Sequence, residues 1–145
     1  MDEDDLLEGS DFLSEKQEKI DGKEKKKKVD NRFTEKDVNR ITSLSDPDDM
    51  MFEIISILRD QVVIPDPGNY YTFIYKASTP RIEYDQFPLI ACVGIFRWGF
   101  RGLNYHWGNF RNYTWEEVIG YLHPVNDLEL KTLRSIPYQN FTINN

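Results

Sequence analysis

The chain has 145 residues, of which 39% are hydrophobic and 30% charged, with a formal net charge of -7. This length predicts one domain with additional segments. No apolar run approaches the ~20 residues that span a bilayer, and the acidic start at residues 1–5 is opposite in charge to an export signal. A single cysteine, Cys92, excludes an intramolecular disulfide and a cysteine-cluster zinc site, and two histidines are too few for a multi-histidine metal site.

Charged and aromatic residues divide the chain into three parts. Residues 1–50 carry 16 acidic and 10 basic side chains, whereas residues 51–145 carry 9 and 8, and 18 of the 20 aromatic residues lie in the second group. A chain buries a core only where apolar side chains are dense enough to offset the loss of conformational entropy. We therefore expect a charged N-terminal arm over 1–32, a helical connector over 33–61 and an aromatic-rich β domain over 62–145.

The arm combines an acidic block with paired apolar residues. Six acids occur in residues 2–11, and two large apolar pairs lie among and after them: Leu6, Leu7, Phe12 and Leu13. In isolation such a segment is expected to be disordered, but acidic stretches with large apolar residues are typical of motifs that fold on a partner. The arm is therefore expected either to bind a neighbouring protein through these four residues or to be a solubilising tail.

Two helices are predicted in the connector. Thr34 and Asp37 form a capping box at the start of the first helix. Asp46 is the predicted N-cap of the second helix, and Pro47 occupies its first position. Apolar residues of the second helix recur at helical spacing: Met50, Met51, Ile54, Ile55 and Leu58. Phe52 and Ile57 lie off this stripe, so we expect the helix to be covered on two sides.

The rest of the chain predicts strands separated by turns. Segments rich in β-branched and aromatic residues indicate strands over 70–76, 89–96, 100–107 and 141–143. Short helices are expected from a capping box at Thr114 to about Leu122, and from Asn126 to Arg134. Together these elements predict an α+β protein whose β domain is a small SH3-like or related barrel, because closure removes exposed strand edges.

The segment 89–96 is almost wholly apolar, which predicts a central strand buried on both faces. An aspartate in place of Ile90 or Val93 should then prevent folding, because an unpaired buried charge costs several kcal/mol. Cys92 lies in the same run, so a reactive thiolate is not expected there.

No motif in the sequence points to catalysis. Neither of the glycine patterns that bind nucleotide phosphates occurs. Asp85 and His106 would form a dyad if the fold brought them together, but the favoured interpretation is a histidine packed among aromatic rings and hydrogen-bonded to the backbone. His123, which precedes Pro124, is expected at the end of a helix. We therefore expect a protein that is not an enzyme and that needs no cofactor.

Arginines alternate with aromatic residues in a stretch that has no acid from residue 86 to 115. The candidate partner-binding residues in this stretch are Arg97, Trp98, Arg101, Trp107 and Arg111. Arginine and tryptophan are common anchors of protein interfaces, and the same residues also suit stacking and phosphate contact with single-stranded nucleic acid. A third interpretation is an aromatic core with guanidinium groups stacked on it. The net negative charge argues against non-specific DNA binding, so a protein interface is favoured and nucleic acid is the alternative.

Four short motifs are PDPG at 65–68, YDQFPL at 84–89, WGFRGLNYHW at 98–107 and LRSIPY at 133–138. With these motifs the chain resembles small proteins encoded by T4-like myoviruses, especially those that infect cyanobacteria. The resemblance covers roughly residues 33–145 and implies a virion component. It predicts a structural or assembly protein of a tailed bacteriophage, made in the host cytoplasm and placed in the tail or baseplate, or else in the neck. Its expected partners are larger phage structural proteins between which it docks.

Overall fold

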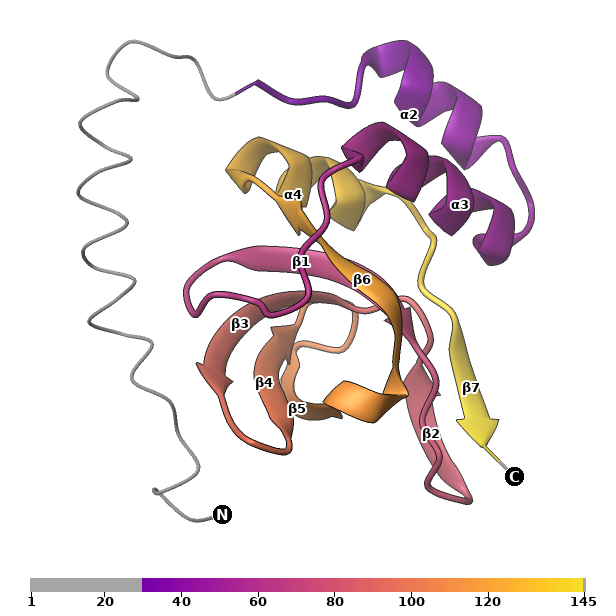
Figure 1. Cartoon of the computed structure of the whole chain (residues 1–145). Coiled ribbons are helices and arrows are strands. Elements are labelled where there is room, and N and C mark those ends of the chain that lie inside the picture. Colours follow the sequence, from indigo (N-terminus) through magenta and orange to yellow (C-terminus); the bar gives the residue numbers. More distant parts are fainter. Residues whose placement is uncertain (1–29, 145) are drawn as a thin grey trace, which may run out of the picture.

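Three α-helices and seven strands make up residues 30–144, the part of the chain that the computed structural model describes (Figure 1). The helices are α2 (Glu35–Thr42), α3 (Pro47–Leu58) and α4 (Asp127–Ser135). The strands are β1 (Tyr70–Tyr75), β2 (Ile82–Asp85), β3 (Leu89–Ile95), β4 (Gly99–Asn104), β5 (Asn109–Thr114), β6 (Val118–Val125) and β7 (Phe141–Asn144). The protein is therefore α+β, as the sequence predicts.

The predicted closed barrel is not formed. Five strands make one antiparallel sheet in the order β5-β4-β3-β1-β6, and β2 and β7 make a separate antiparallel pair. The edge strands β5 and β6 do not pair with each other, so the larger sheet stays open. Figure 1 shows the three helices together on the side of the larger sheet where β1 and β6 lie, and the β2–β7 pair beside the larger sheet.

The predicted helix starts in the connector are confirmed. Thr34 accepts a hydrogen bond from the amide of Asp37, and the Asp37 carboxylate accepts one from the amide of Thr34. Asp46 caps α3 by accepting from the amide of Asp48. Asn126 forms a second capping box at the start of α4. These caps satisfy backbone amides that have no partner within the helix.

The predicted helix after Thr114 is wrong. The Thr114 hydroxyl donates to the Glu117 carboxylate and makes no cap bond to the backbone, and the only helical structure there is a 3-10 turn over Trp115–Glu117. The chain continues as β6, which pairs with β1 from Tyr75↔Val118 to Tyr70↔Val125. His123 therefore lies within a strand and not at a helix end. Pairing along the whole of β1 satisfies more backbone groups than one helical turn.

Three smaller expectations also need correction. The strand predicted to reach Trp107 ends at Asn104, because the buried Asn104 side chain accepts from the amides of His106 and Trp107 and so turns the chain. Val93 is 48% exposed, so β3 is not buried along both faces. Phe52 is 73% exposed, so α3 is not covered at that residue, whereas Ile57 is partly buried against the core.

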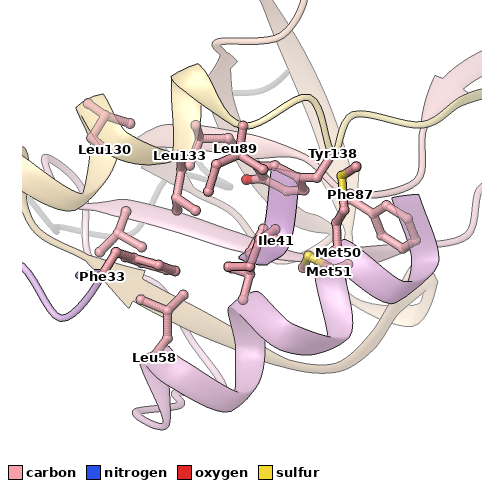
Figure 2. Close-up of a cluster of buried hydrophobic side chains, with 13 residues drawn as sticks. Phe33, Ile41, Met50, Met51, Leu58, Phe87, Leu89, Leu130, Leu133 and Tyr138 are labelled. Carbon is pink, nitrogen blue, oxygen red and sulfur yellow. The ribbon is translucent and has the colours of Figure 1, made fainter. Parts of the chain in front are cut away.

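The buried side chains form two clusters. The helix-side cluster joins α2, α3 and α4 to the start of β3, and Figure 2 shows Ile41, Met51 and Leu133 meeting within it. The aromatic cluster fills the concave face of the sheet with rings that meet edge to face, such as Phe73 and Tyr113 with centroids 5.2 Å apart. Between the clusters, the Thr72 hydroxyl lies 2.9 Å from the Tyr138 hydroxyl. The two cores thus share β1.

Candidate partner-binding groove

An apolar groove of about 390 Å³ lies where β6 approaches the turn between β3 and β4. Its lining residues come from three segments of the chain, 63–64, 95–97 and 115–122, and are Val63, Ile64, Ile95, Phe96, Arg97, Trp115, Val118, Gly120 and Leu122. Arg97 is the single charged residue among them. The groove is thus a hydrophobic surface with one positive charge at its side.

The floor of the groove is buried, but its rim is exposed to solvent. Ile95 and Leu122 belong to the aromatic cluster. Val63 and Ile64 on the rim are 67% and 57% exposed. Large aliphatic side chains gathered around a hollow are a feature of interaction sites, whereas isolated ones are ordinary.

Hydrogen bonds hold both walls of the groove. Val62 and Leu122 exchange two backbone hydrogen bonds of 2.8 and 2.9 Å, which hold the segment after α3 against the edge of β6. Val63 and Ile64 follow directly after this bridge. Pro65 comes next and has no amide hydrogen with which to continue the pairing. On the opposite wall, the Trp115 indole donates to the carbonyls of residues 96 and 97. The rim is therefore held by the fold.

The structure places one of the predicted partner-binding residues in this groove. Arg97 lines it, while the neighbouring Trp98 stacks on Phe96 with the ring planes 7° apart and the centroids 4.9 Å apart. Phe96 lines the groove in turn. Arg97 thus lines the groove, whereas Trp98 contacts one of its lining residues, Phe96.

The remaining predicted arginines do not join this surface. Arg101 pairs with Asn112, and Gly102 pairs with Arg111, so strand alternation puts the two arginines on opposite faces of the sheet. The Arg101 guanidinium lies over the ring of Phe110 at 5.2 Å. The three arginines therefore do not make a single basic patch.

Arg111 belongs to an aromatic stack that shares no residue with the groove. Its guanidinium lies 4.4 Å from the centre of the Trp107 ring. Trp107 in turn stacks on Phe141 of β7, with centroids 4.8 Å apart and ring planes 10° apart. This stack joins the β4–β5 turn to the small sheet.

The other candidate residues of the arm lie outside the described part of the chain: Leu6, Leu7, Phe12 and Leu13. Sequence reasoning did not select Val63 and Ile64, although a signal was present. Three consecutive aliphatic residues, 62–64, stand between the end of a helix and a proline. Such a run is too short for a helix and has no predicted strand partner. An apolar run that no predicted element buries is a signal of an exposed hydrophobic surface.

The fold does bring Asp85 and His106 together. His106 Nδ1 lies 2.6 Å from Asp85 Oδ2, and the two side chains are 5% and 1% exposed. The imidazole meets the Tyr138 ring edge to face, and its Nε2 has no hydrogen-bond partner among the described residues. Because the ring is enclosed by aromatic side chains, the pair has the geometry of a structural link between β2 and the β4–β5 turn. The aromatic packing of His106 is as expected, but the predicted hydrogen bond from its ring to the backbone is wrong, because Nδ1 bonds the Asp85 carboxylate and Nε2 has no partner among the described residues.

A second pocket, of about 180 Å³, lies between β2 and β5. Glu117 on its wall accepts hydrogen bonds from the hydroxyls of Tyr75, Thr114 and Ser78 at 2.6, 2.5 and 2.8 Å. Burial opposes ionisation of this carboxyl, but the donated hydrogen bonds prevail and lower the pKa of Glu117 to about 2. The carboxylate is already engaged by the protein, so we place no ligand there.

Cys92 is buried, as expected, and burial raises the pKa of its thiol to about 12. Within residues 30–144, no group of three or more histidine, cysteine or acidic side chains is arranged to hold a metal ion. No helix of the described residues is long and apolar enough to cross a membrane.

No family model, curated protein or solved structure matches this chain.

Proposed function

We propose that this chain is a non-enzymatic docking protein that binds another protein through the apolar groove. The exposed rim at Val63 and Ile64, beside a hollow of about 390 Å³, carries this proposal. Removing aliphatic surface from water contributes about 25 cal/mol per Å², so a complementary partner segment would be held mainly by burial of the rim. Arg97 supplies a charged anchor at the wall of the groove.

The resemblance to small myovirus proteins suggests the setting. On that basis the chain acts in the virion of a tailed phage as a structural or assembly protein, in the tail or baseplate first and in the neck second. Its partners are larger structural subunits. A small module with one defined groove suits attachment to a larger protein better than a role as a principal building block.

Nucleic acid is the competing partner. Arginines stacked on aromatic rings are compatible with single-stranded DNA, but Arg101 and Arg111 lie on opposite faces of the sheet. One strand of nucleic acid would therefore have to pass around the edge strand β5 to contact both. This arrangement favours a protein partner.

The test compares two aspartate substitutions at exposed apolar residues. Ile64→Asp alters the groove rim, whereas Phe52→Asp alters α3, where Phe52 is 73% exposed and does not line the groove. Both variants should fold. We expect quantitative mass spectrometry of purified particles to show about tenfold or greater loss of the Ile64→Asp protein and normal incorporation of the Phe52→Asp protein.

Absence of the unaltered protein from particles would overturn the proposal. Submicromolar binding of single-stranded DNA, weakening steeply with salt, would establish the alternative.

A further inference from the structure

The N-terminal arm joins the described structure next to the strand that forms the groove. Asn126 Nδ2 donates to the carbonyl of Asp30 at 2.8 Å, and Arg32 Nη2 donates to the carbonyl of Pro124 at 3.1 Å. Pro124 lies in β6, and the same strand continues to Leu122 and Val118 in the groove. The chain before residue 30 thus starts at one end of β6, and the groove lies toward the other end.

The arm is long enough to reach the groove of its own chain. The 16 residues between Leu13 and Asp30 span up to about 55 Å when extended. The eight residues of β6 cover only about 26 Å at ~3.3 Å per residue. A short linker that can span two sites gives an effective concentration in the mM range, which exceeds that of a second copy at micromolar protein. Reach and concentration therefore favour the arm of the same chain over that of a neighbour.

The chemistry of the arm complements that of the groove. Residues 2–13 contain six acids, no base and four large apolar side chains. The groove offers apolar walls, and Arg97 is its single charge. Apolar pairs would fill the hollow while adjacent carboxylates face the guanidinium, and charge complementarity of this kind fixes the register of a bound segment.

We infer that residues 2–13 occupy the groove of their own chain through the Leu6-Leu7 and Phe12-Leu13 pairs. This inference rests on the proposed function, because it takes the same groove as the docking site. The arm then shields the exposed rim of Val63 and Ile64 until a partner displaces it. Docking of the partner and release of the arm become one exchange, and the released arm is free to contact the partner.

Disulfide trapping in the full-length chain tests the inference. The sole native cysteine, Cys92, is buried with a raised pKa and will not compete. The test variant carries Leu7→Cys with Ile64→Cys, and the control carries Leu7→Cys with Phe52→Cys on the exposed side of α3. In a glutathione buffer at low micromolar protein, we expect the effective concentration of the first pair to exceed that of the control about tenfold or more. Equal values, or disulfides found only between chains, would overturn the inference.

A spectroscopic measurement checks the same contact without cysteines. Trp115 lines the groove, whereas Trp107 stacks on β7 away from it. The double substitution Leu6→Asp and Leu7→Asp should shift the indole NMR signal of Trp115 and leave that of Trp107 unchanged. An unchanged Trp115 signal would overturn the inference. If Ile64→Asp still reduces incorporation into particles in that case, the proposed function stands and only the occupant is wrong.

Discussion

The helix-covered side of the sheet is closed by a buried ion pair, whereas the groove-bearing side is held by neutral donors and left open. On the helix side, the fully buried Glu129 receives the Arg32 guanidinium in two hydrogen bonds of 2.7 and 2.9 Å. Burial opposes its ionisation, but hydrogen bonds from Arg32 and from backbone amides lower the pKa of Glu129. On the other side, Glu117 is held by hydroxyl groups. The ion pair thus holds Arg32, which follows the arm, in place. The exposed groove rim at Val63 and Ile64 lies outside both buried clusters, so another segment can cover it without disturbing them.

The largest contrast is expected within β3 itself. Ile90 is fully buried in the aromatic cluster, so Ile90→Asp should prevent folding, because an unpaired buried charge costs several kcal/mol. Val93, three residues later, is 48% exposed, so Val93→Asp should change the free energy of unfolding by about 0.5 kcal/mol or less. Circular dichroism and urea unfolding measure both. Equal damage by the two substitutions would contradict the position of Val93 at the bulge between Cys92 and Gly94.

Removing the buried ion pair should have the next largest effect. Arg32→Ala leaves the Glu129 carboxylate buried without its cation and also removes a donor to the Leu58 carbonyl. We expect a loss of about 3 kcal/mol in the free energy of unfolding, measured by urea denaturation. Arg40→Ala is the matched control, because Arg40 is half exposed and its pairs with Asp37 and Glu53 should contribute about 1 kcal/mol at most.

Adding Glu129→Gln to Arg32→Ala should recover part of the loss, since no unpaired charge then remains buried. If Arg32→Ala lowers the free energy of unfolding no more than Arg40→Ala does, the ion pair between Arg32 and Glu129 contributes no more than an exposed pair.

Helix starts were predictable because their signals are local. Thr34, Asp46 and Asn126 each bond an amide two or three residues ahead, so the sequence contains the whole interaction. The same signal at Thr114 was misleading because β1 offers β6 a longer set of backbone partners. Whether a capping pattern starts a helix thus depends on what strand edge lies nearby, and local sequence does not contain that information.

The candidate site was only partly predictable for a related reason. The aromatic-rich stretch drew attention to Arg97, which lines the groove, but alternation along β4 and β5 separates Arg101 from Arg111. The groove depends on a bridge between Val62 and Leu122, which are 60 positions apart. No spacing rule joins such distant segments. The pairing of Asp85 with His106 is also non-local. An aspartate and a histidine suggested it as a possibility, but nothing in the local sequence shows that the two residues meet.

The hydrogen bonds that hydroxyl groups donate to the Glu117 carboxylate should make the stability of the protein depend on pH in the acid range. Its pKa of about 2 lies below the ordinary value of 4.5, so its stabilisation is complete above 4.5 and is lost as the pH falls toward 2. Glu117→Gln should lower the free energy of unfolding at pH 7 by about 1 kcal/mol, allowing for the partial exposure of this carboxyl. Urea midpoints should converge with those of the unaltered protein near pH 2. Glu116→Gln, at the exposed neighbouring residue, is the control. Its urea midpoint should equal that of the unaltered protein already at pH 7, so no convergence is expected.

The smallest expected effect concerns His123, which lies between the two sides. Its Nδ1–H donates to the carbonyl of Asp60 at 3.1 Å, and burial lowers the pKa of the imidazole below 6.5. The unfolded chain therefore binds more protons than the folded one as the pH falls through 6.5, and stability decreases in that direction. His123→Gln removes this titration, so the difference in urea midpoint between the variant and the unaltered protein should narrow from pH 7.5 to pH 5.5. Taking the difference cancels the contributions of the groups common to both proteins. If the difference in urea midpoint stays constant across that range, protonation of His123 does not destabilise the folded protein. The contact between His123 in β6 and Asp60 after α3 would then contribute nothing measurable to stability.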